Sequence, residues 1–528
     1  MISVTKRTIG LVGILLVAAC GGDPTPPPRS PVAPPSPAQV AAQAPRVTPD
    51  APFRQQPPAA EGKVQFIAPK ITEAKLKNGL RVLVVERHDL PIVSARLVVS
   101  MGAGDLPDAR PGLMSFLGSM LEQGTKKRTA LQISDDFEAI GAGHGTWVDW
   151  DSGGVGVRVL SERLDAALEL MADVALSPTF PDAEIDRLRT RRITAIQAEK
   201  SSPGTIASNA VAAALFGRAH PYGHSMTGEE VDAKKLTRAE LVRAYDRLFN
   251  PQNAAIVVAG DVTQASLLPK LEATFGSWKG KPGAAARKPP KAPSKAATDK
   301  RVVFVDRAGA QSQIQLVRPG VPHSVKERDS FVIANAILGG MFSSRVNMNL
   351  REKHAYTYGA RSYFSMRHGA GPFLVGAAVF ADKTGPAIKE VLNELEGLRR
   401  DGPTEDELAL AKESIRLAMP GRFESVSDVA GAVSDLFVYD LPLDEYEKRP
   451  ARIDAITAAD VKRVAMEYFG SDAMTIVVVG DKATVLPQVA ALELGPVDER
   501  DVYGNPIASQ AAAPKAATPT KPATPEKK

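Results

Sequence analysis

Apolar residues gather in several short runs along the chain, and runs of this length predict half-buried β-strands. In the first half, residues 92–97 form such a run after the dipeptide Asn78-Gly79, which is typical of the turn between two antiparallel strands. The second half holds similar runs at 314–316 and 373–375. The pattern therefore predicts an antiparallel-rich sheet in each half of the chain.

Other segments carry an apolar residue every three or four positions, which is the period of an amphipathic helix. These residues are Leu164, Leu168, Met171 and Val174 in the first half, and Ile388, Val391, Leu392, Leu395 and Leu398 in the second. Because each such helix has one apolar stripe, it buries that stripe against a sheet. We expect an α+β fold in which helices cover one face of each sheet.

The order of these elements repeats along the chain. Residues 236–241 start a helix with a Thr-x-x-Glu capping box, and residues 256–261 form an apolar strand that ends in Gly-Asp. A shift of 220 residues leads to 456–461 and 476–481, which show the same two patterns. Agreement over about 25 positions is improbable by chance, so the chain is predicted to consist of two homologous lobes.

Three motifs in the second half are the most distinctive part of the sequence. They are Arg318-Pro319-Gly320, residues 337–345 with Gly339-Gly340, and Leu350-Arg351-Glu352-Lys353 followed by Tyr356 to Gly359. We interpret the glycines as turns and a helix end, since no Gly-Lys-Ser/Thr follows them as in a phosphate-binding loop. With these motifs, residues 68–485 resemble the pitrilysin/insulinase family of zinc metallopeptidases, the inverzincins. The resemblance implies a two-lobed peptidase clamp.

In that family a helix of the first lobe carries His-x-x-Glu-His, in which both imidazoles hold zinc and the Glu activates the bound water. The matching helix here is expected to begin near Gly112. The resemblance places the two zinc ligands at Ser115 and Ser119, and the base at Gly118. A serine hydroxyl is a poor zinc ligand and glycine has no side chain. The resemblance therefore implies no metal and no catalytic residue in this chain, with zinc on a partner subunit.

The other candidate ligands give little support for a zinc site. The family's downstream Glu falls on Ile196 or Gln197 under this alignment, and Glu199 is out of phase. His144 is expected on an edge strand where substrate would pair, and the loop 220–224 with its two histidines is expected to be structural. No two histidines lie four residues apart on a predicted helix. A zinc site built from relocated ligands nevertheless stays open as an alternative.

Arg351 and Tyr358 are the positive candidates for substrate binding. The resemblance implies that the second lobe supplies an Arg and a Tyr seven residues apart, and both are present here. The guanidinium and the phenol are hydrogen-bond donors for a peptide carbonyl or a developing oxyanion. The structural alternative is an Arg351 paired with Glu352 and a Tyr358 packed in the sheet.

The N-terminus has the pattern of a bacterial lipoprotein signal. Lys6 and Arg7 precede an apolar run too short to span a membrane, and small residues lead to Cys20, the one cysteine of the chain. We interpret 1–19 as a signal peptide and Cys20 as the lipidation site. This predicts a lipid-anchored protein of the bacterial cell envelope, on the outer membrane and facing the periplasm. An ordinary signal peptide followed by a chance cysteine is the alternative.

Composition sets the remaining boundaries. The predicted order is a Pro/Ala-rich tether at 20–62, the first lobe at 63–280, a basic linker at 281–300, the second lobe at 301–495, and a disordered tail at 496–528 whose low-complexity part starts near 508. The linker holds six basic residues and one acid, which accounts for the whole formal charge of +5. The lobes are thus nearly neutral, and the charge is no argument for nucleic-acid binding.

These observations favour a non-zinc subunit of a heterodimeric metallopeptidase. Its partners would be a zinc-bearing homologous subunit, a peptide substrate and, through the lipid anchor, a membrane. A catalytically inactive scaffold or peptide-binding lipoprotein is the second hypothesis, and a zinc metalloendopeptidase with atypical ligands is the third. A homodimer also stays open.

Overall fold

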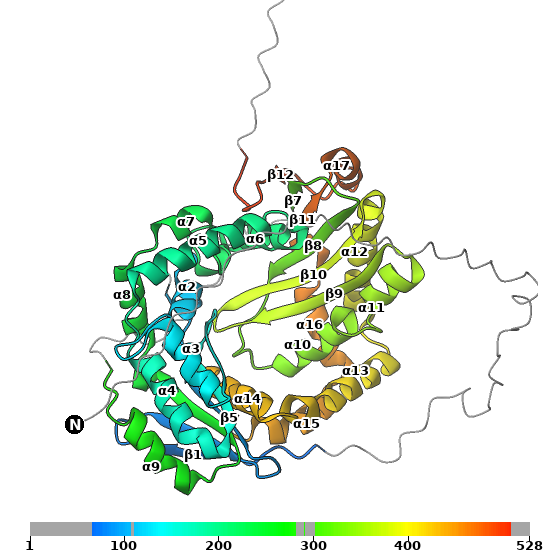
Figure 1. Cartoon of the computed structure of the whole chain (residues 1–528). Helices are drawn as coiled ribbons and strands as arrows, with labels where there is room; N and C mark the ends of the chain where they lie inside the picture. The colour runs from blue at the N-terminus through cyan, green and yellow to red at the C-terminus, as the bar shows by residue number, and fades with distance from the viewer. Residues whose placement is uncertain (1–65, 107–109, 281–289, 291–300, 508–528) are drawn as a thin grey trace, which may run out of the picture. The chain divides into compact units, whose positions relative to one another are not determined.

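The computed structural model describes residues 66–106, 110–280, 290 and 301–507 of the 528 residues. Two six-stranded sheets form in it, one within 66–280 (lobe one) and one within 301–507 (lobe two) (Figure 1). The predicted signal peptide, Cys20, the tether, and all of the linker except Pro290 lie outside the described residues. Within the described ranges, no helix combines the length and the apolar character that crossing a membrane would require.

Sheet one, in lobe one, has the strand order β1–β2–β6–β3–β5–β4. Its strands are β1 (Thr72–Lys75), β2 (Arg81–Glu86), β3 (Ile92–Val99), β4 (Gly143–Val148), β5 (Gly153–Leu160) and β6 (Ala254–Gly260). All neighbours are antiparallel except β2 and β6. The predicted turn between β1 and β2 is confirmed, with Gly79 at a φ of +86° that favours glycine.

Sheet two, in lobe two, has the order β12–β7–β11–β8–β10–β9. Its strands are β7 (Arg301–Asp306), β8 (Gln311–Pro319), β9 (Thr357–Met366), β10 (Ala370–Phe380), β11 (Thr475–Gly480) and β12 (Val497–Glu499). β6 and β11, the strands of the predicted repeat, hold the same place: each is parallel to one neighbour and antiparallel to the other. The two homologous lobes are therefore confirmed.

The repeat breaks at one edge of each sheet. In sheet one the edge strand β1 comes from the N-terminal side and is antiparallel to β2. In sheet two the edge strand β12 comes from the C-terminal side and is parallel to β7, with Val497 opposite Val302. The predicted tail boundary at 496 is therefore wrong for 496–507, because backbone hydrogen bonding to β7 orders these residues.

The helices cover the sheets in both lobes. Lobe one holds α2 (Leu113–Met120), α3 (Ala130–Ala139), α4 (Leu164–Leu176), α5 (Asp182–Glu199), α6 (Pro203–Phe216), α7 (Glu230–Lys235), α8 (Arg238–Leu248) and α9 (Gln264–Phe275). Lobe two holds α10 (Arg328–Asn335), α11 (Arg345–Asn347), α12 (Thr384–Asp401), α13 (Glu405–Ala418), α14 (Val426–Val438), α15 (Glu445–Ala455), α16 (Ala458–Tyr468) and α17 (Lys482–Ala490). Two π-helical turns, Ala336–Gly340 and Met348–Lys353, extend α10 and α11. Thr237 and Thr457 cap α8 and α16 as predicted.

One face of each sheet packs against the helices of its own lobe. Leu168 and Met171 of α4 are fully buried in the core of lobe one. Ile388 and Leu395 of α12 are fully buried in the core of lobe two. The predicted amphipathic helices and the α+β fold class are thus confirmed.

The other face of each sheet packs against a helix of the opposite lobe. Helix α6 of lobe one buries Ile206 and Val211 against β8 and β11 of sheet two. Helix α14 of lobe two buries Val429 and Val433 against β3 and β6 of sheet one. The expectation of helices on one face describes each lobe by itself, and this exchange adds a second covered face. The core strands β6 and β11 are therefore buried on both sides.

Candidate functional site

Helix α2 carries the positions that the resemblance assigns to zinc. Ser115 is half-buried, and its hydroxyl donates to the Met226 carbonyl at 2.6 Å. Ser119 is exposed, and its hydroxyl donates to the Ser115 carbonyl at 3.1 Å. Both hydroxyls thus satisfy backbone carbonyls, as serines in a helix commonly do.

Gly118 is a packing residue. A Cβ atom at this position would lie 2.8 Å from the backbone nitrogen of Val148 in β4, and its own carbonyl accepts a hydrogen bond from Thr146 Oγ1 at 2.8 Å. Helix α2 therefore lies directly against the edge strand of sheet one. A glutamate in the role of base would require the helix or the strand to move.

Lobe two repeats this contact. A Cβ atom at Gly339 would lie 2.6 Å from the backbone nitrogen of Ser362 in β9, the edge strand of sheet two. The sequences match as well, because residues 116–121 (Phe-Leu-Gly-Ser-Met-Leu) resemble residues 337–342 (Ile-Leu-Gly-Gly-Met-Phe). Gly118 is thus the first-lobe copy of a glycine that lets a helix approach an edge strand. This local repeat was the sequence signal that would have identified its role.

Arg192 of α5 is the residue that contacts Ser115. Its Nη1 donates to Ser115 Oγ at 2.9 Å and to the Thr227 carbonyl at 3.3 Å, and its guanidinium lies 5.6 Å from the Phe116 ring centre. Burial lowers the pKa of Arg192, yet an arginine stays charged at neutral pH. A permanent positive charge therefore lies against the first assigned ligand position.

Helix α5 carries the positions that the alignment offers for the family's downstream ligand. Ile196, one turn after Arg192, is buried, while Gln197 is exposed. Glu199 accepts a hydrogen bond from Thr227 Oγ1 at 3.4 Å. The helix face that meets α2 thus presents Arg192, and the sequence reasoning missed this residue because it counted along the chain and did not compare helix faces.

The predicted histidine positions are also placed. His144 lies on the edge strand β4 as expected, with Nδ1 2.9 Å from Glu122 Oε1 and its ring stacked on Phe137. His220 Nδ1 accepts the Tyr222 backbone N–H, in agreement with a structural loop. Within the described ranges, no three His, Cys, Asp or Glu residues gather where a metal ion would bind.

Arg351 and Tyr358 lie at the start of the edge strand of sheet two. Tyr358 is the second residue of β9 and is 82% exposed, so the alternative of a tyrosine packed in the sheet is wrong. Arg351 precedes β9 and is partly exposed, with its Nε 3.4 Å from Glu352 Oε1 and its guanidinium 4.7 Å from the Phe342 ring centre. The expected neighbouring acid is therefore present. Glu352 is partly exposed too, and a salt bridge between two exposed side chains contributes little to the free energy of folding.

The edge strands β4 and β9 differ from the inner strands in their backbone pairing. β4 and β9 each have one neighbour, so one side of each backbone has no strand partner within the described sheets. Such an edge accepts an extended peptide as an additional strand. Tyr358 stands on β9 itself, and His144 stands on β4.

Comparison with known proteins identifies the family. The model described as insulinase (peptidase family M16) matches residues 81–229, and the model of the peptidase M16 inactive domain matches residues 235–415. The chain belongs to the insulinase (M16) family of peptidases. Among M16 relatives, an uncharacterized zinc protease of Rickettsia felis is 27% identical over 344 residues, covering 65% of this chain and 81% of the relative. An uncharacterized zinc protease of Mycobacterium bovis is 26% identical over 404 residues, covering 76% and 90%.

Solved structures have the same M16 fold. The crystal structure of a peptidase M16 inactive domain from Pseudomonas fluorescens is 26% identical and aligns with a TM-score of 0.72, covering 78% of this chain and 98% of the other. A protease from Helicobacter pylori is 21% identical, with a TM-score of 0.71 over 78% of this chain and 100% of the other. The inactive-domain fold is therefore shared over both lobes.

Proposed function

We propose that this M16 chain is the non-zinc subunit of a heterodimeric metallopeptidase. It holds an extended peptide in position, and a homologous partner subunit supplies the zinc. The observation that carries this proposal is the hydrogen bond from Arg192 to Ser115 on the helix that would bear the zinc motif.

The chemistry around α2 opposes metal binding. A divalent cation next to the Arg192 guanidinium would experience like-charge repulsion at short range. The hydroxyls of Ser115 and Ser119 are neutral oxygens already bonded to backbone carbonyls. The close approach of Gly118 to β4 leaves no space for a glutamate side chain that would act as the general base. All three features oppose the binding of a catalytic zinc ion on α2.

The second lobe supports a role in substrate positioning. Within the part of the chain that the structure describes, no hydrogen bond engages the Tyr358 hydroxyl, which is therefore available to a ligand. Arg351 keeps part of its guanidinium in solvent. Both side chains flank the exposed edge of β9, where a peptide would pair with the backbone. Their donors would hold a carbonyl and stabilise charge on it in the active site of the partner.

Co-purification tests the proposal. The full chain, tagged and isolated from its native envelope in detergent, is expected to carry a second M16 chain with an intact His-x-x-Glu-His. The pair is expected to cleave peptides in a manner that EDTA abolishes, whereas this chain alone is inactive and holds far less than one zinc. Zinc-dependent cleavage by the isolated chain would overturn the proposal. Replacing Cys20 with Ser should release the chain from the membrane fraction, which tests the proposed lipid anchor separately.

A catalytically inactive scaffold is the second candidate. It is favoured by the match of residues 235–415 to the model that is described as an inactive domain. The same experiment discriminates the two. Isolation of the chain with bound peptides or envelope proteins, but without any zinc-bearing M16 chain, would support the scaffold.

A further inference from the structure

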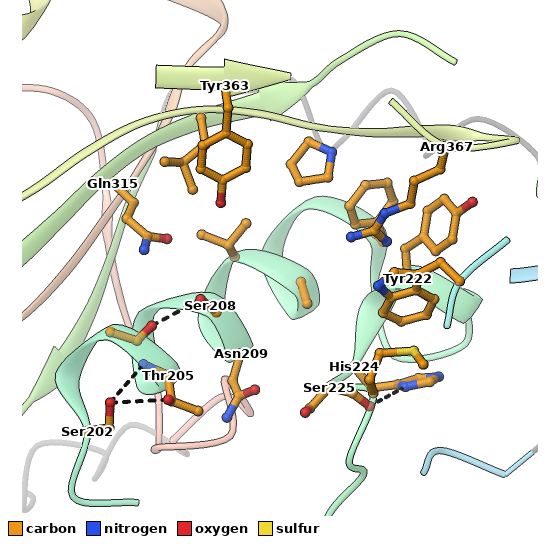
Figure 2. A pocket seen from close by; sticks show the side chains of 18 residues that line it. Ser202, Thr205, Ser208, Asn209, Tyr222, His224, Ser225, Gln315, Tyr363 and Arg367 are labelled. Carbon is orange, nitrogen blue, oxygen red and sulfur yellow. Dashed lines mark hydrogen bonds between the residues drawn. The ribbon is translucent and has the colours of Figure 1, made fainter. Parts of the chain in front are cut away.

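A pocket of about 530 Å³ lies between the two lobes, away from α2 and from Arg351. Helix α6 and the loop with Tyr222 to Met226 form one wall, and β8, β9 and β10 form the other (Figure 2). Its volume is in the range of pockets that hold small ligands. The exchange of α6 onto sheet two creates this pocket, because the helix and the sheet belong to different lobes.

Arg367 carries the one permanent charge among the side chains that line the pocket in the described part of the chain. Its guanidinium lies 4.5 Å from the ring centres of both Trp150 and Tyr222, whose planes are nearly perpendicular to each other, and its Nε donates to Ser365 Oγ at 3.1 Å. Contact with these two rings holds the guanidinium in place and removes part of its water. Among the described residues, no carboxylate lines the same pocket. The lining is therefore positive and lacks its own counter-charge.

Asp151, the carboxylate that acts on Arg367, is already engaged. Asp151 acts favourably on Arg367 over a distance, but it is no part of the pocket wall. Its Oδ2 accepts from the Tyr439 hydroxyl at 3.0 Å, and its Oδ1 accepts from the His368 backbone N–H at 3.1 Å. The hydrogen-bonding edge of the guanidinium is thus left for a group that enters the pocket.

Gln315 of β8 provides a second, independent sign of a ligand. The residue is 7% exposed, lines the pocket, and its Oε1 is buried without a hydrogen-bond partner among the described residues (Figure 2). A buried amide oxygen without a donor costs stability, so such atoms commonly meet a water or a ligand. A hydrogen-bond donor on an occupant of the pocket would satisfy this oxygen.

Tyr363 completes the polar lining from the sheet side. Tyr363 lies in β9, four residues before Arg367. Its ring points into the pocket, opposite Ser208 and Asn209 of α6 (Figure 2). Asn209 already donates to the Val502 carbonyl and Ser208 to the Gly204 carbonyl. Three lining side chains on the side of sheet two thus have polar atoms left for a ligand: Gln315, Tyr363 and Arg367.

We propose that this pocket binds the C-terminal end of a short peptide, with the α-carboxylate on Arg367 and a backbone N–H on Gln315. One end of the ligand then supplies the missing negative charge and the other supplies the missing donor. A planar guanidinium suits a carboxylate because two parallel hydrogen bonds form. The proposal goes beyond the proposed function, since it needs neither a partner subunit nor cleavage.

Calorimetric titration of the full chain in detergent tests the inference. The probes are N-acetyl-tetra-alanine with a free carboxylate and the same peptide with a C-terminal carboxamide. The acid is expected to bind at least about tenfold more tightly than the amide, which is the effect of a hydrogen bond to a charged group. Equal affinities, or no binding of either peptide, would overturn the proposal. Competition by acetate at the same concentration as the peptide would also overturn it, because the site would then take any small carboxylate.

Variants locate the effect. Arg367→Gln is expected to remove the preference for the acid, and Arg367→Lys to keep a reduced preference. Gln315→Leu should weaken both peptides by a similar factor. Arg361→Gln is the matched control, since Arg361 is exposed on β9 and does not line the pocket. Loss of the preference in the Arg361 variant alone would place the site elsewhere and contradict the proposal. The comparison of acid and amide on the unchanged chain holds even if a variant fails to fold.

Discussion

The hydroxyl of Tyr439, one residue after α14, donates a hydrogen bond at 3.0 Å to Oδ2 of Asp151, between β4 and β5. This bond joins lobe two to lobe one. His368 adds to the junction, with Nδ1 3.4 Å from Asp105 Oδ2 and Nε2 2.9 Å from the Val438 carbonyl. The Val438 carbonyl and the Asp105 carboxylate are both acceptors, so a protonated imidazole, which donates from both nitrogens, suits this site.

This junction predicts that stability depends on pH. Burial by itself would lower the pKa of His368, but the hydrogen bond to Asp105 and the charge of Asp151 raise it above the usual 6.5. The protonated ring therefore stabilises the fold fully below pH 6.5, and this contribution is lost as pH rises through the raised pKa. Denaturant unfolding at a series of pH values from 6 upward should show a fall in the free energy of unfolding.

The matched control uses a neighbouring histidine. His323 stacks on Tyr439 at 3.8 Å, but burial lowers its pKa to about 3, so it is neutral throughout this range. We expect His368→Gln to flatten the pH dependence and His323→Gln to preserve it. A pH dependence that survives in the His368 variant would contradict the assignment.

Gly118 predicts a packing defect. Because an added Cβ would lie 2.8 Å from Val148 N, Gly118→Ala should lower the free energy of unfolding by about 1–3 kcal/mol, the usual cost of overpacking. Gly421→Ala is the control, since no atom lies within 4 Å of its added Cβ, and stability should be unchanged or slightly raised. Both are measured by denaturant titration. Equal stability of the two variants would show that α2 can withdraw from β4.

The same geometry predicts that the zinc motif cannot be restored by simple replacement. The triple variant Ser115→His, Gly118→Glu, Ser119→His is expected to bind much less than one zinc per chain by elemental analysis. The reasons are the lack of space at Gly118 and the Arg192 guanidinium, which now contacts Ser115. Stoichiometric zinc in the triple variant would mean that neither feature blocks the metal.

Arg351 and Tyr358 predict a loss of turnover in the complex with a zinc-bearing partner. Arg351→Ala should lower kcat by ~10²–10³, the usual cost of an oxyanion donor, and Tyr358→Phe should lower it in the same direction. Arg400→Ala is a matched control, because Arg400 is also exposed and pairs with the next residue, Asp401. Steady-state kinetics of the reconstituted pair decide the matter. An unchanged kcat in both site variants would show that neither Arg351 nor Tyr358 contributes to the reaction.

The exchanged helices predict that damage in one lobe weakens the other. Ile206 of α6 is 1% exposed against sheet two, so Ile206→Ala should cost about 2–5 kcal/mol. Hydrogen exchange read by mass spectrometry should show a larger loss of protection in β8 and β11 of lobe two than in β3 of lobe one. Leu131→Ala, at a residue 70% exposed on α3, should change neither. Loss confined to lobe one would contradict the exchange.

Much of the fold was predictable because it is encoded locally. The caps at Thr237 and Thr457 depend on residues three positions apart, and the turn at Gly79 depends on a dipeptide. The duplication followed from comparing the chain with itself. The tail boundary was misplaced because three residues of β12 have no strong strand pattern, and their order comes from pairing with β7, some 195 residues away along the chain.

The candidate site on α2 also divides into a part that the sequence indicates and a part that only the structure shows. The sequence by itself indicated that Ser115, Gly118 and Ser119, the positions to which the resemblance assigns the zinc motif, offer no strong zinc ligand and no base. It could not show that Arg192 bonds to Ser115, because that contact depends on the rotation of α5 against α2.

The sequence thus determined two homologous α+β lobes with their caps and turns, since each of these depends on neighbours in the chain or on residue identity alone. The tertiary structure decided which helix covers which sheet. The apolar residues of α6 and α14 do not by themselves indicate which sheet each helix covers, and only packing of the whole chain assigns each to the opposite lobe. That assignment places Gln315 and Arg367 at one pocket, although 52 residues separate them in sequence.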